Sequence, residues 1–382
     1  MKGILIAGSL STLLSFLFTP TLIKLLTRQE IGQMIRDDGP KSHHSKKGTP
    51  TMGGIVFISA SVVAYLISHL VTGVALSASA LLVIALIVGL GIVGFIDDYL
   101  KVAKKQSLGL TARAKLAGQA LVAALFAFAG IHFKDAANLT PISKNLSTMR
   151  ETTFHMGTVL VILWVVFLIL SSSNGVNLAD GLDGLASGVV AIAGFAFFSF
   201  AYVLAVVYGF DRAGAPSTIT AVMIGACLGF LPHNVHPAKI FMGDSGSMLL
   251  GLLLATAAIT LTGQVDPNAI SDQKLGPTFL PLLLPFAVLA IPLADLGLAV
   301  LRRVRAGKSP FAPDKEHLHH RVLAAGNSQI RTSIILYIWT AAIAFPVTIW
   351  AFAPLWVASL VGVALAGLAI YIYKLGSRKI NV

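Results

Sequence analysis

Long apolar stretches follow one another through almost the whole sequence, separated by short polar segments. A helix needs about 20 mostly apolar residues to cross a bilayer, so this pattern predicts an all-α, polytopic bundle of membrane-spanning helices. Only 12% of the 382 residues are charged, against about 25% in soluble proteins, and a soluble fold could not bury so much apolar surface. The predicted spans are residues 4–25, 52–72, 77–96, 112–132, 157–176, 185–208, 216–233, 246–264, 278–301, 332–350 and 352–373.

The last two stretches are separated only by a turn near Pro354, so the prediction is eleven spans, or ten if these two form one. With the amino terminus outside, the segments 26–51, 97–115, 177–184, 234–245 and 302–331 lie inside. Cytoplasmic loops are enriched in lysine and arginine, which identifies the inside as the cytoplasm. Of the 28 basic residues, the few left outside are Lys2, Lys134, Lys144, Arg150, Arg212 and Lys274.

The net charge of +12 therefore follows from topology and from contact with the anionic lipid of the inner leaflet. Nucleic acid need not be a partner. No repeat and no appended soluble domain interrupts the pattern, so residues 1–382 are predicted to form one membrane domain whose inner loops carry the chemistry.

Two adjacent acids, Asp97 and Asp98, end the third predicted span, and Lys101 follows. Ionised groups near hydrocarbon are costly and usually functional. Adjacent carboxylates repel each other unless a cation or a proton intervenes, and Mg²⁺ with phosphate oxygens meets that need. The alternative is a solvated helix end. Lys115 begins the next span, where it contacts a phosphate or serves only as a positive-inside residue.

A second motif, Asn177, Asp180 and Asp183, has the spacing i, i+3, i+6, which on a helix puts neighbouring members on one face. The glycines at 181 and 184 permit a close approach of a ligand or a helix, and a glycine-flexed helix end is the alternative. The third motif places Asp244 between two glycines at the start of a helix, where it is a metal ligand or a helix cap. Asn234 and Phe241 precede it, and Phe241 either stacks on a base or belongs to the core.

Two basic segments complete the set. The last inner loop carries His317, His319, His320 and Arg321, which suit phosphate or sugar-nucleotide binding; zinc binding and an unoccupied basic loop are the alternatives. The first inner loop carries Lys41 and His43, which contact a phosphate or lipid headgroups.

These motifs, in this order, resemble the polyprenyl-phosphate N-acetylhexosamine-1-phosphate transferase superfamily over nearly the whole chain. The two halves resemble different branches, and a chimeric or otherwise unusual sequence is one interpretation of this difference. Segments 36–43 (Arg-Asp-Asp-Gly-Pro-Lys-Ser-His) and 48–54 (Gly-Thr-Pro-Thr-Met-Gly-Gly) are similar to the phospho-N-acetylmuramoyl-pentapeptide transferases. Segments 241–247 (Phe-Met-Gly-Asp-Ser-Gly-Ser) and 312–321 are similar to actinobacterial polyprenyl-phosphate N-acetylglucosamine-1-phosphate transferases, because Leu318 interrupts the three consecutive histidines of the muramoyl branch.

The resemblance implies a bacterial cytoplasmic-membrane enzyme of cell-envelope and peptidoglycan biosynthesis, with its active site on the cytoplasmic face. It implies Mg²⁺, a UDP-N-acetylhexosamine donor, a polyprenyl phosphate acceptor, release of UMP, and a homodimer. Asp97, Asp98 and Asp244 are then the catalytic carboxylates, with Asp244, Asp98 and Asn177 on the metal and Asp97 as the base. The expected substrate-binding residues are Lys41, Lys101, Lys115, Asn177, Asp180, Asp183, Asn234, Phe241, His317, His319, His320 and Arg321.

The last inner loop favours UDP-N-acetylglucosamine as the donor, and UDP-N-acetylmuramoyl-pentapeptide is the alternative. A secondary transporter is a remote alternative, because transporter sites lie near the bilayer midplane, whereas most acids here end helices on the inner side. Asp295, inside the ninth predicted span beside Pro292, is the exception and fits a transporter site or a proline kink.

Overall fold

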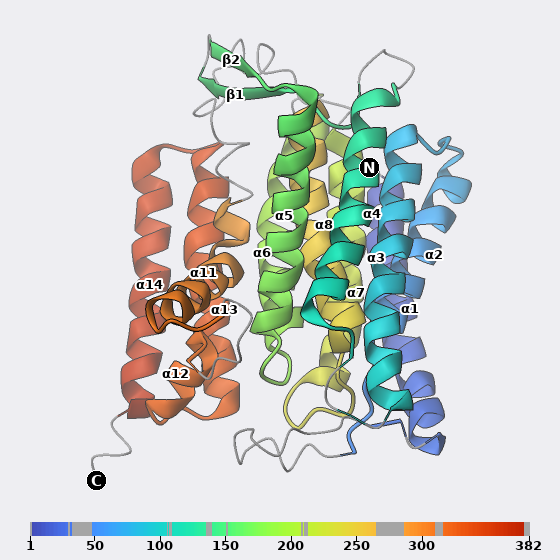
Figure 1. The fold of residues 1–382 in the computed structure, drawn as a ribbon. Helices are drawn as coiled ribbons and strands as arrows, with labels where there is room; N and C mark the ends of the chain where they lie inside the picture. Colours follow the sequence, from blue (N-terminus) through green and yellow to red (C-terminus); the bar gives the residue numbers. More distant parts are fainter. Residues whose placement is uncertain are drawn as a thin grey trace.

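The computed structural model describes residues 2–29, 31–32, 48–104, 106, 109–134, 140–149, 152–207, 209, 213–264, 286–309 and 316–377 (Figure 1). Within this part, ten helices are long and apolar enough to cross a membrane, which confirms the predicted all-α membrane bundle. They are α1 (Lys2–Arg28), α2 (Gly54–Thr72), α3 (Ala78–Ala103), α4 (Ala112–His132), α5 (Thr158–Ala179), α6 (Leu185–Val206), α7 (Gly214–Asn234), α8 (Gly243–Gln264), α13 (Gln329–Trp350) and α14 (Leu355–Ser377).

The last two predicted spans are separate helices, since α13 ends at Trp350 and α14 begins at Leu355. The ninth predicted span, 278–301, lies partly outside the described residues. In its described part, α11 (Ala290–Arg305) has 16 residues and is not among the ten long helices. A short helix, α12 (Leu318–Ala324), follows it.

One element was not predicted. Strands β1 (Asn145–Met149) and β2 (Thr152–His155) form an antiparallel hairpin between α4 and α5, and Figure 1 shows it beyond one end of the bundle. Its strands, NLSTM and TTFH, are short and contain large apolar residues only at Leu146, Met149 and Phe154, which is too weak a hydrophobic pattern to distinguish them from a loop.

Helices α1 and α7 show how the bundle holds together. A Cβ atom on Gly225 would lie 2.3 Å from the Gly8 carbonyl oxygen, so the two backbones are in direct contact. The buried hydroxyls of Ser11 and Ser15 on α1 donate hydrogen bonds to carbonyl oxygens of α7, each at 2.8 Å. Because lipid is as apolar as the helices, close packing of small residues and interhelical hydrogen bonds are what drive association in a membrane.

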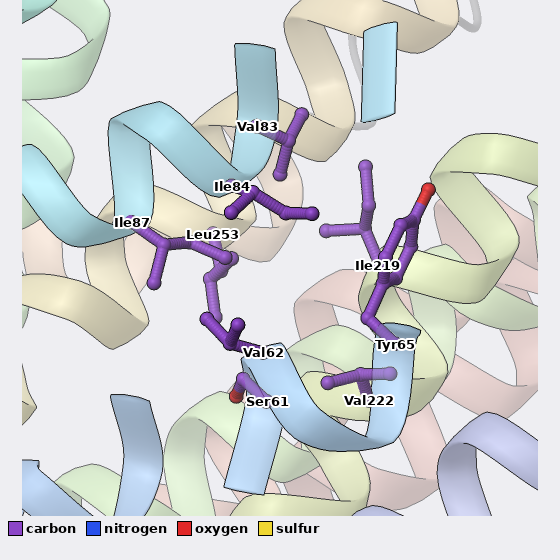
Figure 2. Close-up of a pocket in the computed structure, with 9 residues that line it drawn as sticks. All are labelled: Ser61, Val62, Tyr65, Val83, Ile84, Ile87, Ile219, Val222 and Leu253. Atoms are coloured by element: carbon purple, nitrogen blue, oxygen red, sulfur yellow. The ribbon is translucent and has the colours of Figure 1, made fainter. Parts of the chain in front are cut away.

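Helix α8 lies at the centre of this bundle, because 94% of its most apolar stretch is buried. A small cavity lies between α2, α3, α7 and α8 (Figure 2), lined by Ser61, Val62, Tyr65, Val83, Ile84, Ile87, Ile219, Val222 and Leu253. The volume of this cavity is about 10 Å³, which is enough for about one water molecule. The cavity is therefore too small to hold a lipid chain.

The polar motifs converge on one end of the bundle, as predicted. Asp97 at the end of α3, Lys115 at the start of α4 and Asp244 at the start of α8 are in contact. The Tyr337 hydroxyl of α13 donates a 2.5 Å hydrogen bond to the carbonyl of Gly184, just before α6. Since β2 precedes the opposite end of α5, this face lies away from the hairpin (Figure 1).

Candidate active site

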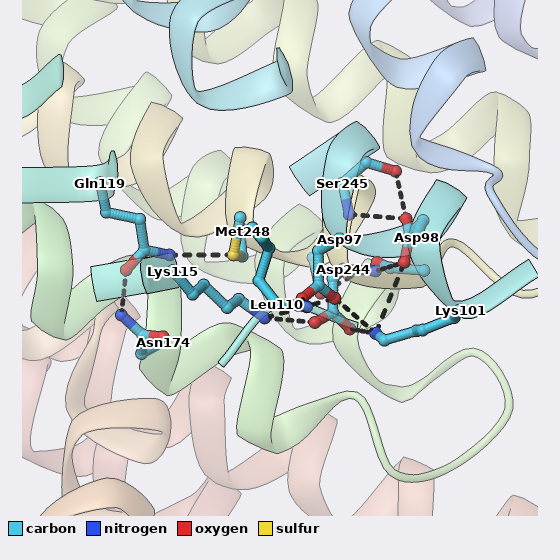
Figure 3. A network of polar contacts seen from close by, with 12 residues as sticks. Asp97, Asp98, Lys101, Leu110, Lys115, Gln119, Asn174, Asp244, Ser245 and Met248 are labelled. Carbon is cyan, nitrogen blue, oxygen red and sulfur yellow. Dashed lines mark hydrogen bonds and ion pairs between the residues drawn. The ribbon is translucent and has the colours of Figure 1, made fainter. Parts of the chain in front are cut away.

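Three carboxylates meet where the end of α3 contacts the start of α8. Asp97, Asp98 and Asp244 each offer an oxygen atom, and these atoms lie within 4.8 Å of one another (Figure 3). Asp97 and Asp98 are buried, whereas the side chain of Asp244 is 21% exposed. Oxygen ligands from clustered carboxylates suit a hard divalent cation, so the donor set fits a metal, with Asp244 as the accessible ligand.

Two lysines surround the carboxylates (Figure 3). The Lys101 Nζ atom lies 2.7 Å from Asp97 Oδ2, 3.0 Å from Asp244 Oδ1 and 3.7 Å from Asp98 Oδ1. Lys115 Nζ contacts Asp244 Oδ2 directly and lies 4.0 Å from Asp97 Oδ2. Three carboxylates against two ammonium groups leave about one unit of negative charge, so the cluster can accept a cation. We call these five residues the carboxylate–lysine cluster.

Although Asp97 and Asp98 are adjacent in sequence, their side chains contact different residues, because successive residues of a helix point about 100° apart. Asp98 accepts hydrogen bonds from the amides of Asp244 and Ser245, both at 3.0 Å, and from the Ser245 hydroxyl at 2.7 Å. The first amides of a helix have no partner within it, so Asp98 caps α8 from another helix. Asp97 instead accepts a 2.8 Å bond from the Leu110 amide and pairs with Lys101.

These contacts bear on the predicted metal ligands. Asp98 Oδ2 accepts two hydrogen bonds from Ser245, and Oδ1 accepts one from the Asp244 amide, so only Oδ1 has a direction left for a metal. The role of Asp98 as a metal ligand stays a prediction. Ser245, which holds Asp98 in place, was absent from the predicted site residues. A glycine followed by an acid and a serine at a helix start was visible in the sequence, but nothing in it paired that serine with Asp98.

Close backbone contacts fix this arrangement. Gly243, just before Asp244, has φ +71°, a conformation that favours glycine, and a Cβ atom there would lie 2.5 Å from Asp98 Oδ2. A Cβ on Gly94 would lie 2.5 Å from Ser245 Cα, and one on Gly54 would lie 2.3 Å from the Gly246 nitrogen. Helices α2, α3 and α8 therefore touch through backbone atoms immediately beside the carboxylates.

The segment that precedes α2 is bonded to the segment that precedes α8. The Phe241 amide donates to the Pro50 carbonyl at 2.8 Å, and the Gly53 amide donates to the Phe241 carbonyl at 2.9 Å. Phe241 is half-buried and is thus held next to the cluster by its backbone. Lys41 and His43, also predicted to contact phosphate, lie outside the described residues.

The second motif does not lie on a single helix, contrary to the predicted i, i+3, i+6 face. Helix α5 ends at Ala179, so Asp180 caps it and Asp183 lies in the turn before α6. Asp183 Oδ2 is hydrogen-bonded to His236 Nδ1 at 2.8 Å and accepts from the Ala238 amide at 3.3 Å. Asn177 is half-buried in the last turn of α5, and its backbone carbonyl accepts a hydrogen bond from the Asp180 amide. The role of the Asn177 side chain as a metal ligand stays a prediction.

Asn234 has a structural role in the same region. Its side-chain amide donates to the Ile240 carbonyl at 2.9 Å, and its side-chain oxygen accepts from the Ser187 hydroxyl at 3.2 Å. Together with the Asp183 contacts, these bonds shape segment 234–240, which leads to Phe241 and Asp244.

The histidines of the last inner loop lie against the second motif. A Cβ atom on Gly181 would lie 2.1 Å from His319 Nε2, and the His319 and His320 ring centroids are 4.2 Å apart. His317 Nδ1 is hydrogen-bonded to Asp295 Oδ2 at 3.1 Å, and the Leu318 amide donates to Asp295 Oδ1 at 2.9 Å. Asp295 is thus the hydrogen-bond partner of His317 and of the Leu318 amide.

Arg321 is exposed on α12. The zinc alternative for the histidines gains no support: within the described ranges, the three aspartates are the only group of three or more metal-binding side chains with ligand atoms this close. The structure therefore brings together two sets of residues, the carboxylate–lysine cluster and a histidine-rich region formed by Asp183, His236, Asp295, His317, His319 and His320.

Comparison with known proteins gives consistent matches. Residues 79–262 match glycosyl transferase family 4, and residues 46–58 match the phospho-N-acetylmuramoyl-pentapeptide-transferase signature 1. The chain is 47% identical over 273 residues to the phospho-N-acetylmuramoyl-pentapeptide-transferase of Streptomyces griseus, covering 68% of this chain and 77% of that one. It is 44% identical over 286 residues to the protein of the same name from Kineococcus radiotolerans, covering 69% of this chain and 79% of that one.

These matches do not support a chimera. A match over 68% of the chain extends well beyond its first 180 residues, and the family match at 79–262 also crosses that point. One kind of relative therefore matches residues on both sides of position 180.

Proposed function

Because this chain belongs to the family of the phospho-N-acetylmuramoyl-pentapeptide-transferases, we propose that it transfers phospho-N-acetylmuramoyl-pentapeptide from UDP to polyprenyl phosphate and releases UMP. The enzyme is a multi-pass membrane phosphotransferase of glycosyl transferase family 4. The observation that carries the proposal is the carboxylate–lysine cluster at the buried junction of α3, α4 and α8. A transporter is not favoured, because this cluster lies at helix ends and Asp295 is bonded to His317.

The donor differs from the one that the last inner loop predicted. That prediction rested on Leu318, which interrupts the histidine run. The Leu318 side chain packs with an apolar cluster around Leu182, Leu185, Val189 and Leu336, and its amide bonds Asp295. A leucine that packs in an apolar cluster gives no reason to exclude the muramoyl donor. The phospho-N-acetylmuramoyl-pentapeptide-transferases compared above are 44–47% identical to this chain. We therefore favour UDP-N-acetylmuramoyl-pentapeptide over UDP-N-acetylglucosamine.

The chemistry follows from charge. Transfer of a phosphoryl group between two anions depends mainly on positioning and on neutralisation of charge. Lys101 and Lys115 present their ammonium groups beside the carboxylates, where they can exchange a carboxylate for a donor phosphate oxygen. Asp244 would hold Mg²⁺, with Asp98 and Asn177 as further predicted ligands. When bound, Mg²⁺ supplies charge neutralisation at the pyrophosphate.

Asp97 is the candidate base for the lipid phosphate. A phosphate monoester has its second pKa near 6, so the acceptor is largely dianionic at neutral pH and needs little proton removal. The pairing of Asp97 with Lys101 at 2.7 Å then matters for the electrostatics of the cluster as much as for proton transfer. The residues around the histidine-rich region, including Asp180, Asp183, Asn234, Phe241, His317, His319, His320 and Arg321, are the candidates for holding the nucleotide and the sugar.

The site is expected on the cytoplasmic face of a bacterial inner membrane, because most lysines and arginines lie in the segments on that side. A reporter fused after Val382 should be cytoplasmic, and a periplasmic result would require a different number of crossings. The single membrane domain and the homodimer are tested by the behaviour of the purified chain: cross-linking in native membranes should trap a dimer, and a monomer at all cross-linker concentrations would exclude it.

The deciding experiment offers the purified protein both UDP-N-acetylmuramoyl-pentapeptide and UDP-N-acetylglucosamine at equal concentration, with polyprenyl phosphate and Mg²⁺. The product lipid is identified by mass, and the Asp244→Asn variant is the control. We expect only the muramoyl-pentapeptide lipid, together with UMP. A product that carries N-acetylglucosamine alone would overturn the donor. The absence of UMP with either donor would overturn the transferase itself.

A further inference from the structure

A second group of polar residues lies one layer deeper in the bundle than the carboxylate–lysine cluster (Figure 3). The side-chain nitrogen of Gln119 on α4 donates to Met248 Sδ on α8 at 2.9 Å. The side-chain oxygen of Gln119 accepts from the Asn174 amide on α5 at 2.8 Å. Gln119 and Met248 are fully buried. The Gln119 side chain thus links α4 to both α5 and α8.

Helical spacing relates this deeper layer to the site. Gln119 follows Lys115 by four residues on α4, and Met248 follows Asp244 by four residues on α8. Asn174 precedes Asn177 by three residues on α5. Residues three and four apart are neighbours on one helix face. Each member of the deeper layer therefore lies one turn from a residue of the site on the same helix.

A buried amide group in an apolar environment is costly to leave without partners, so Gln119 restricts how far α4 can slide or rotate against α5 and α8. Lys115 depends on that restriction. Its ammonium group reaches from α4 to Asp244 on α8, and a shift of α4 along its axis would separate the two. An error of about 1 Å in the placement of a reacting group can lower a rate by about 100-fold.

We propose that Gln119 is a positioning residue, which sets α4 against α5 and α8 so that Lys115 meets Asp244. The proposal rests on the proposed transferase function for its kinetic readout. The competing explanation is that Gln119 only stabilises the bundle, as Ser11 does where it bonds α1 to α7 at 2.8 Å. Ser11 is equally buried and equally interhelical, which makes Ser11→Ala the matched control.

The first experiment measures kcat, KM for the donor and Tm in detergent for Gln119→Leu, Asn174→Leu, the double variant and Ser11→Ala. We expect Gln119→Leu to lower kcat by about 10- to 100-fold while KM changes less than about threefold. Ser11→Ala should lower Tm and keep kcat. In the double variant both hydrogen-bonding side chains are replaced by apolar groups, so neither is left buried without a partner. We therefore expect its Tm to be higher than that of Gln119→Leu, while its kcat stays low. Recovery of kcat together with Tm would overturn the positioning role.

A second experiment reads the geometry without any turnover. The Lys115 side chain is 14% exposed and paired with Asp244, which protects its amine from acylation. We expect acetic anhydride to modify Lys115 several-fold faster in Gln119→Leu than in wild type, as measured by mass spectrometry of the peptide, and at the wild-type rate in Ser11→Ala. Unchanged Lys115 reactivity in Gln119→Leu would refute the inference whatever the donor is. A protein that turns over neither donor but shows the altered reactivity would refute the proposed function alone.

Discussion

The carboxylate–lysine cluster and the histidine-rich region both contain buried aspartates, but the side chains that pair with these aspartates differ. In the cluster, Asp97 and Asp244 face two lysines, and the charges are shared among several partners at 2.7–4.0 Å. In the histidine-rich region, each of two buried aspartates has a hydrogen-bonded histidine and one backbone amide: His236 and Ala238 for Asp183, His317 and Leu318 for Asp295.

The difference concerns what each aspartate leaves available. Lysine contacts can be exchanged for a cation or a phosphate, because ammonium groups on long side chains move at little cost. A carboxylate that holds a backbone amide and a histidine ring fixes a loop instead. The comparison therefore assigns charge handling to the first region and loop shape to the second, and the following variants test this division, from the largest expected effect to the smallest.

The cluster should be the most sensitive part of the molecule. We expect Asp97→Asn, Asp98→Asn and Asp244→Asn each to lower UMP release by more than about 100-fold, since a metal-ligand or charge contact is worth several kcal/mol and about 1.4 kcal/mol corresponds to tenfold. Mg²⁺ titration of each variant is the informative measurement. Retention of more than about a tenth of wild-type turnover by Asp244→Asn would remove it from the metal site.

The histidine-rich region should be less sensitive. In Asp295→Asn the His317 ring loses its carboxylate partner while the side chain keeps its shape, so we expect a loss of about tenfold in kcat/KM, mostly in KM for the donor. Asp183→Asn is the parallel variant, because it makes the same change beside His236. If Asp295→Asn instead raised the Mg²⁺ requirement, the separation into two regions would fail.

Ser245→Ala tests whether Asp98 acts through α8. The substitution removes one of the three hydrogen bonds to Asp98 described above and keeps the two from backbone amides. The lost hydrogen bond is worth about 1 kcal/mol of stability. We expect a lower Tm and a kcat reduced by about two- to fivefold. Thermal unfolding in detergent and initial rates measure the two effects, and a loss as large as that of Asp98→Asn would show that the serine hydroxyl itself takes part in the reaction.

The smallest effect is expected for Leu318→His, which makes residues 317–320 four consecutive histidines. Since Leu318 packs in an apolar cluster, the substitution should lower Tm and leave the preferred donor unchanged. Competition between the two UDP-sugars measures this. A change of donor in this variant would place specificity in the loop rather than in the shared fold.

The sequence was sufficient for the helices because apolar length predicts membrane spans directly: every described long helix corresponds to a predicted span. It also predicted that Asp97, Asp98 and Asp244 converge, since alternating topology places their helix ends on one face. The pairing of Asp295 with His317 could not be predicted, because it depends on how α11 packs. The contacts of Ser245 and Gln119 likewise depend on helix rotation, which an almost uniformly apolar sequence does not indicate. The sequence-based preference for UDP-N-acetylglucosamine depended on one residue, Leu318, whose side chain packs against an apolar cluster, and the relatives support the alternative donor instead.

The glycines beside the carboxylates have an evolutionary consequence. Gly54 and Gly94 allow α2 and α3 to touch the start of α8, and a Cβ atom on either would overlap backbone atoms. Every missense mutation reached from a glycine codon by one nucleotide change adds at least a Cβ atom. Substitution of either glycine would therefore displace Asp98 and Asp244, so an inhibitor bound beside them would meet little acquired resistance through these two positions.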